Sequence, residues 1–133
     1  MAKRPAFSLI ELLVVIALIG ILVAVATVSY STIQKRSRDS RRVTDLKTIQ
    51  QGLEQYYTDT NSSYPSSPCS SAGVIYFPSG SLPANPKTGD PYPENCTTTG
   101  YCICAELEVT VGNAAANDCT GTTGTFYCIK NTQ

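Results

Sequence analysis

The chain has 133 residues, 42% apolar and 15% charged, and its ten basic side chains balance ten acidic ones. A formal net charge of zero does not indicate a general nucleic-acid-binding surface. The sequence contains no histidine, which removes the usual nucleophile–base pairs of enzymes. We therefore predict no enzyme activity, no catalytic residue and no cofactor.

The N-terminal segment, residues 1–6, reads MAKRPA and is followed at once by a long apolar run. Lys3 and Arg4 beside such a run favour retention of the N-terminus in the cytoplasm.

Residues 7–28, FSLIELLVVIALIGILVAVATV, are apolar except for a few small polar side chains and one charged residue, Glu11. As a helix they cover about 33 Å, which matches a hydrocarbon core of roughly 30 Å. An ionised side chain at the centre of such a helix costs on the order of 2.5–3.5 kcal/mol, and less near its end. Glu11 therefore either meets a positive charge on another molecule or lies at headgroup level.

Five cations follow the apolar run and outnumber those before it: Lys35, Arg36, Arg38, Arg41 and Arg42. The positive-inside rule alone would place this flank in the cytoplasm. We still expect the N-terminus inside, because a long downstream domain translocates regardless of its charge. The cysteines, all at or after Cys69, also favour an oxidising compartment for that domain.

The helix is predicted to continue through residues 29–58, because no proline stands between Ala6 and Tyr64. In this half the predicted buried stripe has three- and four-residue spacing, with Ile49 and Tyr56 flanking it: Val43, Leu46, Leu53 and Tyr57. Other faces are assigned to Arg42, Asp45, Lys47 and Glu54. The helix should end in the segment TDTNSS before Tyr64-Pro65.

The remaining residues, 59–133, are predicted to form a small head with a long loop and antiparallel strands. One short strand candidate is 74–77, and a second strand, from Cys102 to Val111, alternates apolar and polar residues. A third strand is predicted for Thr125–Lys130. Glu106 and Glu108 are expected to be solvated on the outer face of their strand.

Six cysteines are disulfide candidates: Cys69, Cys96, Cys102, Cys104, Cys119 and Cys128. The alternation places Cys102, Cys104 and Cys128 on one sheet face, so we predict that Cys128 bonds Cys102 or Cys104. The other pairings stay open. No metal site is predicted, because the spacing lacks paired C-x-x-C knuckles.

Phe7 followed by SLIELLVVIALIGILVAVA resembles the N-terminal signature of type IV pilins and of type II secretion pseudopilins. The resemblance implies a leader that a prepilin peptidase cuts between Ala6 and Phe7, with methylation of the new Phe7 amine. Glu11 matches the family's glutamate, which is thought to neutralise the amine of a neighbouring subunit in the filament. The family usually has glycine before the cut, where this chain has Ala6.

The resemblance extends more loosely to LKTIQQGLEQYYTDTNSSYP and LPANPKTGDPY. The fold expected from all these features is α+β and pilin-like. One long helix packs by its C-terminal half against a small antiparallel sheet in a disulfide-stapled head. Asp90 and Asp118 are conceivable calcium ligands by analogy with pseudopilins, but the chain has no dense carboxylate run.

The preferred function is that of a structural subunit of a type IV pilus-like filament. Its expected partners are further copies of itself, the prepilin peptidase, an inner-membrane assembly platform and, before assembly, membrane lipid. The precursor is expected in a bacterial inner membrane with its head outside, and the filament in the periplasm or outside the cell. One alternative is a major pseudopilin of type II secretion. Another is a secreted disulfide-rich binding protein whose ordinary signal peptide ends at Ala24-Val25-Ala26.

Overall fold

The computed structural model describes residues 7–73, 75–77, 79–120 and 123–133, leaving out the side chains of 27–29. The predicted leader, 1–6, with Ala6, lies outside this part. The elements are a helix α1 (Leu9–Asp59), a 3₁₀ helix η1 (Cys69–Ala72) and the strands β1 (Glu94–Thr97), β2 (Gly100–Glu106) and β3 (Phe126–Lys130). The strands form one antiparallel sheet in the order β1-β2-β3. The predicted α+β pilin-like fold is confirmed.

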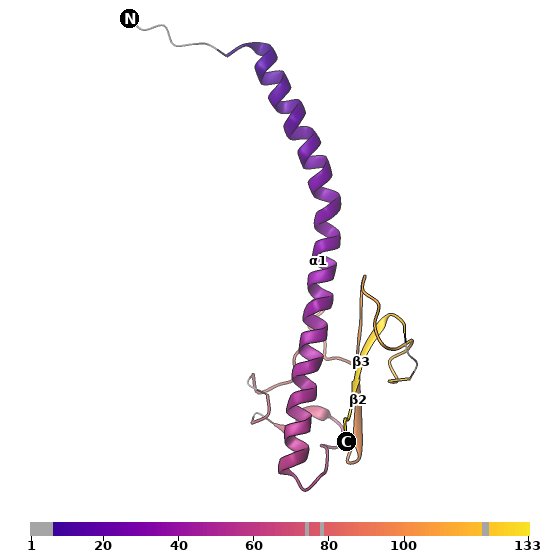
Figure 1. Cartoon of the computed structure of the whole chain (residues 1–133). Coiled ribbons are helices and arrows are strands. Elements are labelled where there is room, and N and C mark those ends of the chain that lie inside the picture. The colour runs from indigo at the N-terminus through magenta and orange to yellow at the C-terminus, as the bar shows by residue number, and fades with distance from the viewer. Residues whose placement is uncertain (1–6, 74, 78, 121–122) are drawn as a thin grey trace, which may run out of the picture. The chain divides into compact units, whose positions relative to one another are not determined.

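The chain divides into two compact units between Gln34 and Lys35. The first contributes the N-terminal part of α1, and the second, residues 35–133, contains the rest of the helix and the sheet (Figure 1). All three disulfides also lie in the second unit. We refer to the second unit as the head.

The end of α1 lies close to the position that the polar segment TDTNSS predicts. After Asp59, Asn61 and Ser62 have positive φ angles of 54° and 62°. The N–H of Ser62 donates to the carbonyl oxygen of Tyr57 (3.1 Å), which caps a carbonyl of the last turn. Asparagine tolerates this left-handed conformation better than most residues, so the local sequence itself stops the helix.

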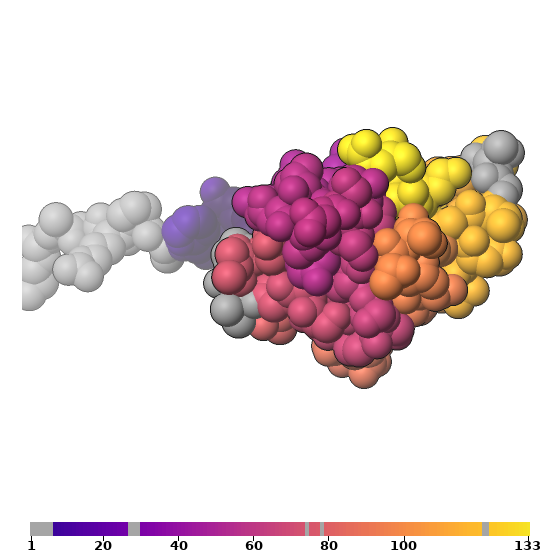
Figure 2. All heavy atoms as spheres, turned by 90° about the horizontal axis from the view of Figure 1, so that it is seen from below, coloured from indigo at the N-terminus to yellow at the C-terminus, as the bar shows by residue number. Residues whose placement is uncertain are grey.

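Three side chains of α1 form the helical side of the head core: Leu46, Ile49 and Leu53, all fully buried. The predicted stripe was partly wrong. Val43 and Tyr57 are only half-buried, whereas Ile49, expected to flank the stripe, lies at its centre. Seen end-on, the C-terminal residues lie against the last turns of the helix (Figure 2), where the Nε2 of Gln50 donates to the Lys130 carbonyl (3.1 Å).

The sheet and the loops supply the opposite side of this core through buried aromatic and aliphatic side chains: Tyr64, Phe77, Tyr92, Tyr101, Ile103, Ala105 and Ile129. Gly52 allows the close approach of one loop, because a Cβ atom there would collide with the Phe77 ring and the Tyr76 carbonyl.

The strand predictions were correct in part. β3 begins at Phe126 and ends at Lys130, close to the predicted span. The strand predicted from Cys102 to Val111 is wrong in its second half, because β2 ends at Glu106. β1 was not predicted, since its sequence ENCT has no alternation. Val74 of the 74–77 candidate lies outside the described residues, and Ile75 and Tyr76 form a turn.

Three disulfides pair all six cysteines: Cys69–Cys96, Cys102–Cys119 and Cys104–Cys128. The predicted partner of Cys128 is confirmed as Cys104, which lies directly opposite it in the β2–β3 register. Alternation in β2 sends Ile103 and Ala105 into the main core and Cys104 into a separate buried cluster with Cys128 and Ala114.

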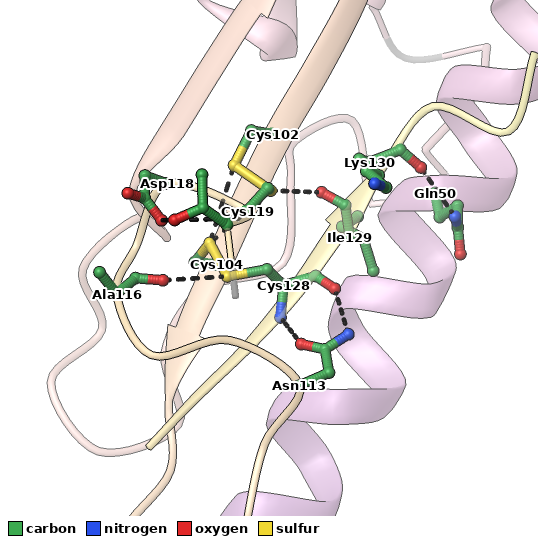
Figure 3. The surroundings of a disulfide bond; sticks show 11 residues. Gln50, Cys102, Cys104, Asn113, Ala116, Asp118, Cys119, Cys128, Ile129 and Lys130 are labelled. Carbon is green, nitrogen blue, oxygen red and sulfur yellow. Dashed lines mark hydrogen bonds between the residues drawn. A yellow bond between two sulfur atoms is a disulfide. The ribbon is translucent and has the colours of Figure 1, made fainter. Parts of the chain in front are cut away.

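The outer edge of β3 is covered by a side chain (Figure 3). The carboxamide of Asn113 accepts a hydrogen bond from the N–H of Cys128 (2.7 Å) and donates one to its carbonyl oxygen (2.9 Å). Asn113 thereby satisfies the two backbone groups that a fourth strand would have paired.

Candidate functional site

The start of α1 is organised by Ser8 and Glu11. The carbonyl oxygen of Ser8 accepts the N–H groups of Glu11 (3.1 Å) and Leu12 (3.3 Å), so Ser8 is the N-cap. The N–H of Ser8 donates to Oε2 of Glu11 (3.1 Å). A glutamate at the third helical position that bonds back to the N-cap amide forms half of a capping box, and its charge is favoured there by the helix dipole.

Among the described residues, the Glu11 carboxylate thus has the Ser8 N–H as a hydrogen-bond partner, which the sequence reasoning did not anticipate. The carboxylate remains exposed, and a single neutral N–H does not neutralise it. Ser8 holds it beside Phe7, the residue whose amine the predicted cleavage would release.

The apolar side chains on both sides of Glu11 are exposed from Phe7 to Val25. Between Phe7 and Val25 the large ones range from 50% exposed at Val15 to 84% at Phe7. By length and composition α1 can cross a membrane, with a mean hydropathy of 3.1 over its most apolar 18 residues, none of them buried. So large an apolar surface requires lipid or other protein chains around it.

Comparison with known sequences shows which proteins the N-terminal site resembles. The prokaryotic N-terminal methylation motif matches residues 1–27. The type IV major pilin protein PilA of Myxococcus xanthus (strain DK1622) is 38% identical over 57 residues, 43% of this chain and 26% of the relative. The type II secretion system core protein G of Vibrio cholerae serotype O1 (strain ATCC 39315) is 27% identical over 89 residues, 67% of this chain and 60% of the relative.

The motif and both relatives support the resemblance of this chain to the type IV pilin and pseudopilin family. The matches span less than two thirds of either relative's own length. No solved structure matches the chain. Pilins and pseudopilins are structural subunits, and the N-terminal motif together with the apolar helix fits a membrane-anchored precursor that later enters a filament.

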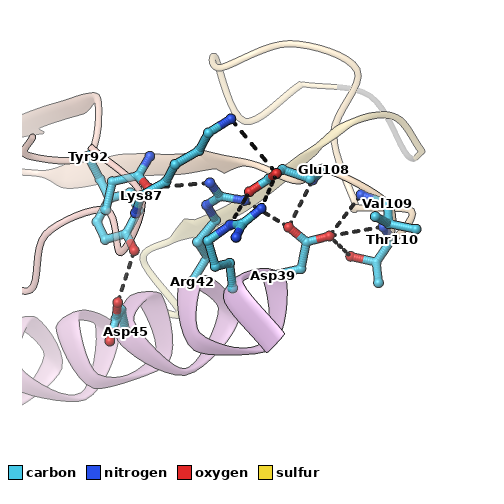
Figure 4. Close-up of polar contacts among 10 residues, drawn as sticks. Asp39, Arg42, Asp45, Lys87, Tyr92, Glu108, Val109 and Thr110 are labelled. Atoms are coloured by element: carbon cyan, nitrogen blue, oxygen red, sulfur yellow. Dashed lines mark hydrogen bonds and ion pairs between the residues drawn. The ribbon is translucent and has the colours of Figure 1, made fainter. Parts of the chain in front are cut away.

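The head contains an ionic cluster, built around the buried Asp39 and Arg42, that the sequence reasoning missed (Figure 4). Asp39 is 1% exposed, and its carboxylate accepts the N–H groups of Glu108 (2.8 Å), Val109 (2.9 Å) and Thr110 (3.1 Å). These three amides leave the β2–β3 ladder to bind the helix carboxylate. This explains why the alternating pattern continues to Val111 while the strand ends at Glu106.

Arg42 links the carboxylate of Asp39 to the carboxylate of Glu108. Its side chain is 3% exposed, and Nη1 lies 2.8 Å from Oδ1 of Asp39 and 3.0 Å from Oε1 of Glu108. Arg38 completes the cluster with two hydrogen bonds of 2.7 Å to the Glu108 carboxylate. The expectations that Glu108 is solvated and that Arg42 lies off the buried face were therefore wrong.

The signal that could have identified the cluster is spacing. Asp39 and Arg42 stand at the next two positions of the same 3-4-3-4 series as Leu46, Ile49 and Leu53. A carboxylate and a guanidinium that continue a buried stripe must be paired, because an isolated buried charge is too costly.

Two carboxyl groups of the cluster have depressed pKa values. The hydrogen bonds from Arg38 lower the pKa of Glu108 to about 2, despite the opposing effect of burial. Burial raises the pKa of Asp39, but hydrogen bonds from the three backbone amides and Arg42 outweigh it, so the net shift is downward.

The depressed pKa of Glu108 makes head stability depend on acidity. Since its folded pKa lies below the ordinary 4.5, the ion pairs stabilise the head fully above roughly pH 5 and are lost as pH falls toward about 2. We expect the denaturant midpoint of the head to fall over this window. Glu108→Gln should lower the midpoint at pH 7 and flatten its pH dependence. An unchanged acid profile in this variant would contradict the assignment.

A second carboxylate, Glu54, fixes the C-terminal end of the head. Its Oε1 accepts the Tyr101 hydroxyl (2.8 Å) and the N–H of Thr132 (3.1 Å), and its Oε2 accepts the Tyr64 hydroxyl (3.0 Å). Burial and the adjacent Glu54 carboxylate raise the pKa of both tyrosines. Asp39 and Glu54 thus have a structural role, because each carboxylate joins distant segments of the head to α1.

Metal binding has no support in the part of the chain that the structure describes. The one cluster with suitable spacing is Cys102, Cys104 and Cys119, whose sulfurs are all engaged in disulfides. The conceivable calcium ligand Asp118 instead accepts the backbone N–H (3.0 Å) and the hydroxyl (2.7 Å) of Thr120.

Proposed function

We propose that the chain is the structural subunit of a type IV pilus-like filament and that it polymerises through the N-terminal part of α1. The observation that carries this proposal is a methylation motif on an exposed apolar segment of α1 with one carboxylate near its start. A prepilin peptidase cuts between Ala6 and Phe7 and methylates the Phe7 amine.

Glu11 then acts as the assembly residue. In a bundle of apolar helices its carboxylate pairs with the positive amine of Phe7 on a neighbouring copy. Buried ion pairs contribute little net stability, but leaving either charge alone is costly. The pair therefore selects one axial position for each incoming subunit, and the capping bond from Ser8 holds the carboxylate in place.

The precursor lies in the bacterial inner membrane with its N-terminus in the cytoplasm and its head outside. There its apolar helix contacts lipid, and an inner-membrane assembly platform extracts it into the filament. The three disulfides accord with an oxidising location for the head.

The N-terminus of the mature protein tests this proposal. Mass spectrometry of the chain purified from its own membranes or filaments should give a first residue of Phe7 carrying one methyl group. A chain that starts at Thr27, as after an ordinary signal peptidase, would contradict the filament function. An intact Met1 in assembled filaments would contradict the processing step.

A second candidate is a major pseudopilin of type II secretion. It is favoured by the reach of the match to core protein G, which covers 67% of this chain, against 43% for the pilin. Immunogold labelling of cells that express the native gene distinguishes the two. Long surface filaments support the pilus, and label confined to the periplasm, with loss of protein secretion on deletion, supports the pseudopilus.

A further inference from the structure

The five cations that follow the apolar segment fall into two groups in the structure. Arg38 and Arg42 are used inside the head, where they pair with Glu108 and Asp39. In contrast, Lys35, Arg36 and Arg41 are exposed and form no ion pair with any described residue. The head fold therefore accounts for two of the five charges and leaves three for another partner.

Lys35 belongs to a surface pocket of about 490 Å³ in the head. Polar and cationic side chains dominate its lining, which includes Lys35, Lys87, Arg42, Asn85 and Thr88. Two carboxylates, Glu106 and Glu108, also face it. Arg42 and Glu108 are already paired within the ionic cluster, and the Nζ of Lys87 lies 3.8 Å from Oε2 of Glu108. Outside that cluster, the ammonium groups of Lys35 and Lys87 face the single carboxylate of Glu106.

One buried donor of this pocket lacks a partner. The side chain of Arg42 is 3% exposed, and its Nε forms no hydrogen bond with any described group, although both Nη atoms are paired. An unpaired guanidinium N–H together with the ammonium groups of Lys35 and Lys87 favours an anionic oxygen ligand such as a phosphate.

The position of Lys35 along the chain indicates where that phosphate comes from. Lys35 follows the apolar segment by seven helical residues, about 10 Å beyond Val28. Between them in the sequence stands Tyr30, which is exposed, and tyrosine is a residue type that is enriched at the headgroup layer of membranes. A lysine side chain extends its charge several ångströms back toward the membrane surface.

We propose that this pocket of the head binds the phosphate of a bilayer lipid headgroup, with Lys35 and Lys87 as its cationic ligands. The inference rests on the proposed membrane-anchored precursor. Binding keeps the head against the outer surface of the membrane before assembly, and extraction of the subunit into a filament breaks the contact.

The four lysines of the described part provide an internal test. The full chain is placed in nanodiscs of phosphatidylglycerol or in neutral maltoside detergent and acetylated with a water-soluble ester, and each lysine is quantified by mass spectrometry. We expect Lys35 and Lys87 to react about tenfold more slowly in the nanodiscs. Lys47 and Lys130, which are exposed outside the pocket, should react equally in both.

Matched lipids and variants distinguish protection by lipid phosphate from protection by the bilayer itself or by contact between chains. Protection should disappear in nanodiscs of a phosphate-free galactolipid, and Lys87→Gln should weaken protection of Lys35 while Lys130→Gln does not. Equal rates for all four lysines, protection that persists in galactolipid, or protection that grows with the number of chains per disc would each overturn the proposal. A chain that fails to enter nanodiscs would instead contradict the anchored precursor, and the lipid contact with it.

Discussion

Glu11→Gln is expected to abolish filament assembly while the chain still folds and inserts into the membrane. Glutamine can accept the same hydrogen bond from the Ser8 N–H that Glu11 accepts now. The substitution thus keeps the helix cap and removes only the charge. An amine buried without its counter-charge costs on the order of 3–5 kcal/mol per subunit, which corresponds to a loss of roughly a hundredfold or more in subunit addition.

The measurement is the yield of sheared filaments relative to the amount of chain that co-sediments with membranes. Glu11→Ala, which removes both cap and charge, should fail equally. Glu106→Gln, which removes one exposed carboxylate of the head, should assemble normally. If Glu11→Gln filaments form at the native level while Glu11→Ala filaments do not, the residue acts through the helix cap, and the charge-pairing proposal is wrong.

Asp39→Ala is expected to produce the largest loss of head stability among single substitutions of the ionic cluster. It removes the acceptor of three backbone N–H groups and the partner of a nearly fully buried guanidinium. Breaking one side of a buried ion pair costs about 3–5 kcal/mol, a large share of the 5–15 kcal/mol that stabilises a typical domain. Segment 107–111 should detach from α1.

Denaturant unfolding of the detergent-solubilised chain, followed by the near-ultraviolet circular dichroism of its tyrosines, measures this loss. Asp39→Asn keeps an oxygen acceptor and should lose less than Asp39→Ala. Asp90→Ala, at an exposed turn carboxylate, serves as the matched control and should change the midpoint little. An Asp39→Ala midpoint within error of the control would show that the carboxylate does not hold the segment.

The disulfides show which cysteine pairings can be predicted from local sequence and which cannot. Alternation along β2 separated Cys104 from Ile103 and Ala105, which was enough to predict that Cys128 bonds Cys102 or Cys104. It could not predict that Cys69 bonds Cys96. That pairing depends on how the long loop folds back onto β1, a strand without any periodic signal.

The sequence by itself determined the features that depend on neighbours a few residues away. These are the apolar segment 7–28, the place of Glu11 at the start of its helix, the end of α1 after Asp59 and the alternation in β2. Each follows from the periodicity of burial or from backbone preferences within one or two turns.

Only the tertiary structure decided the partners of Asp39, Arg42 and Glu108. Asp39 and Glu108 are 69 residues apart, and whether a charged residue on a helix is solvated or buried depends on which distant backbone amides reach it. In the head those amides belong to Glu108, Val109 and Thr110, whose sequence continues the alternating pattern of β2. The pattern alone does not say whether these N–H groups pair with a neighbouring strand or with the Asp39 carboxylate, and tertiary packing decides it. Glu11, by contrast, is conspicuous in the sequence without any fold, because it is the one charged residue of the 22-residue segment 7–28.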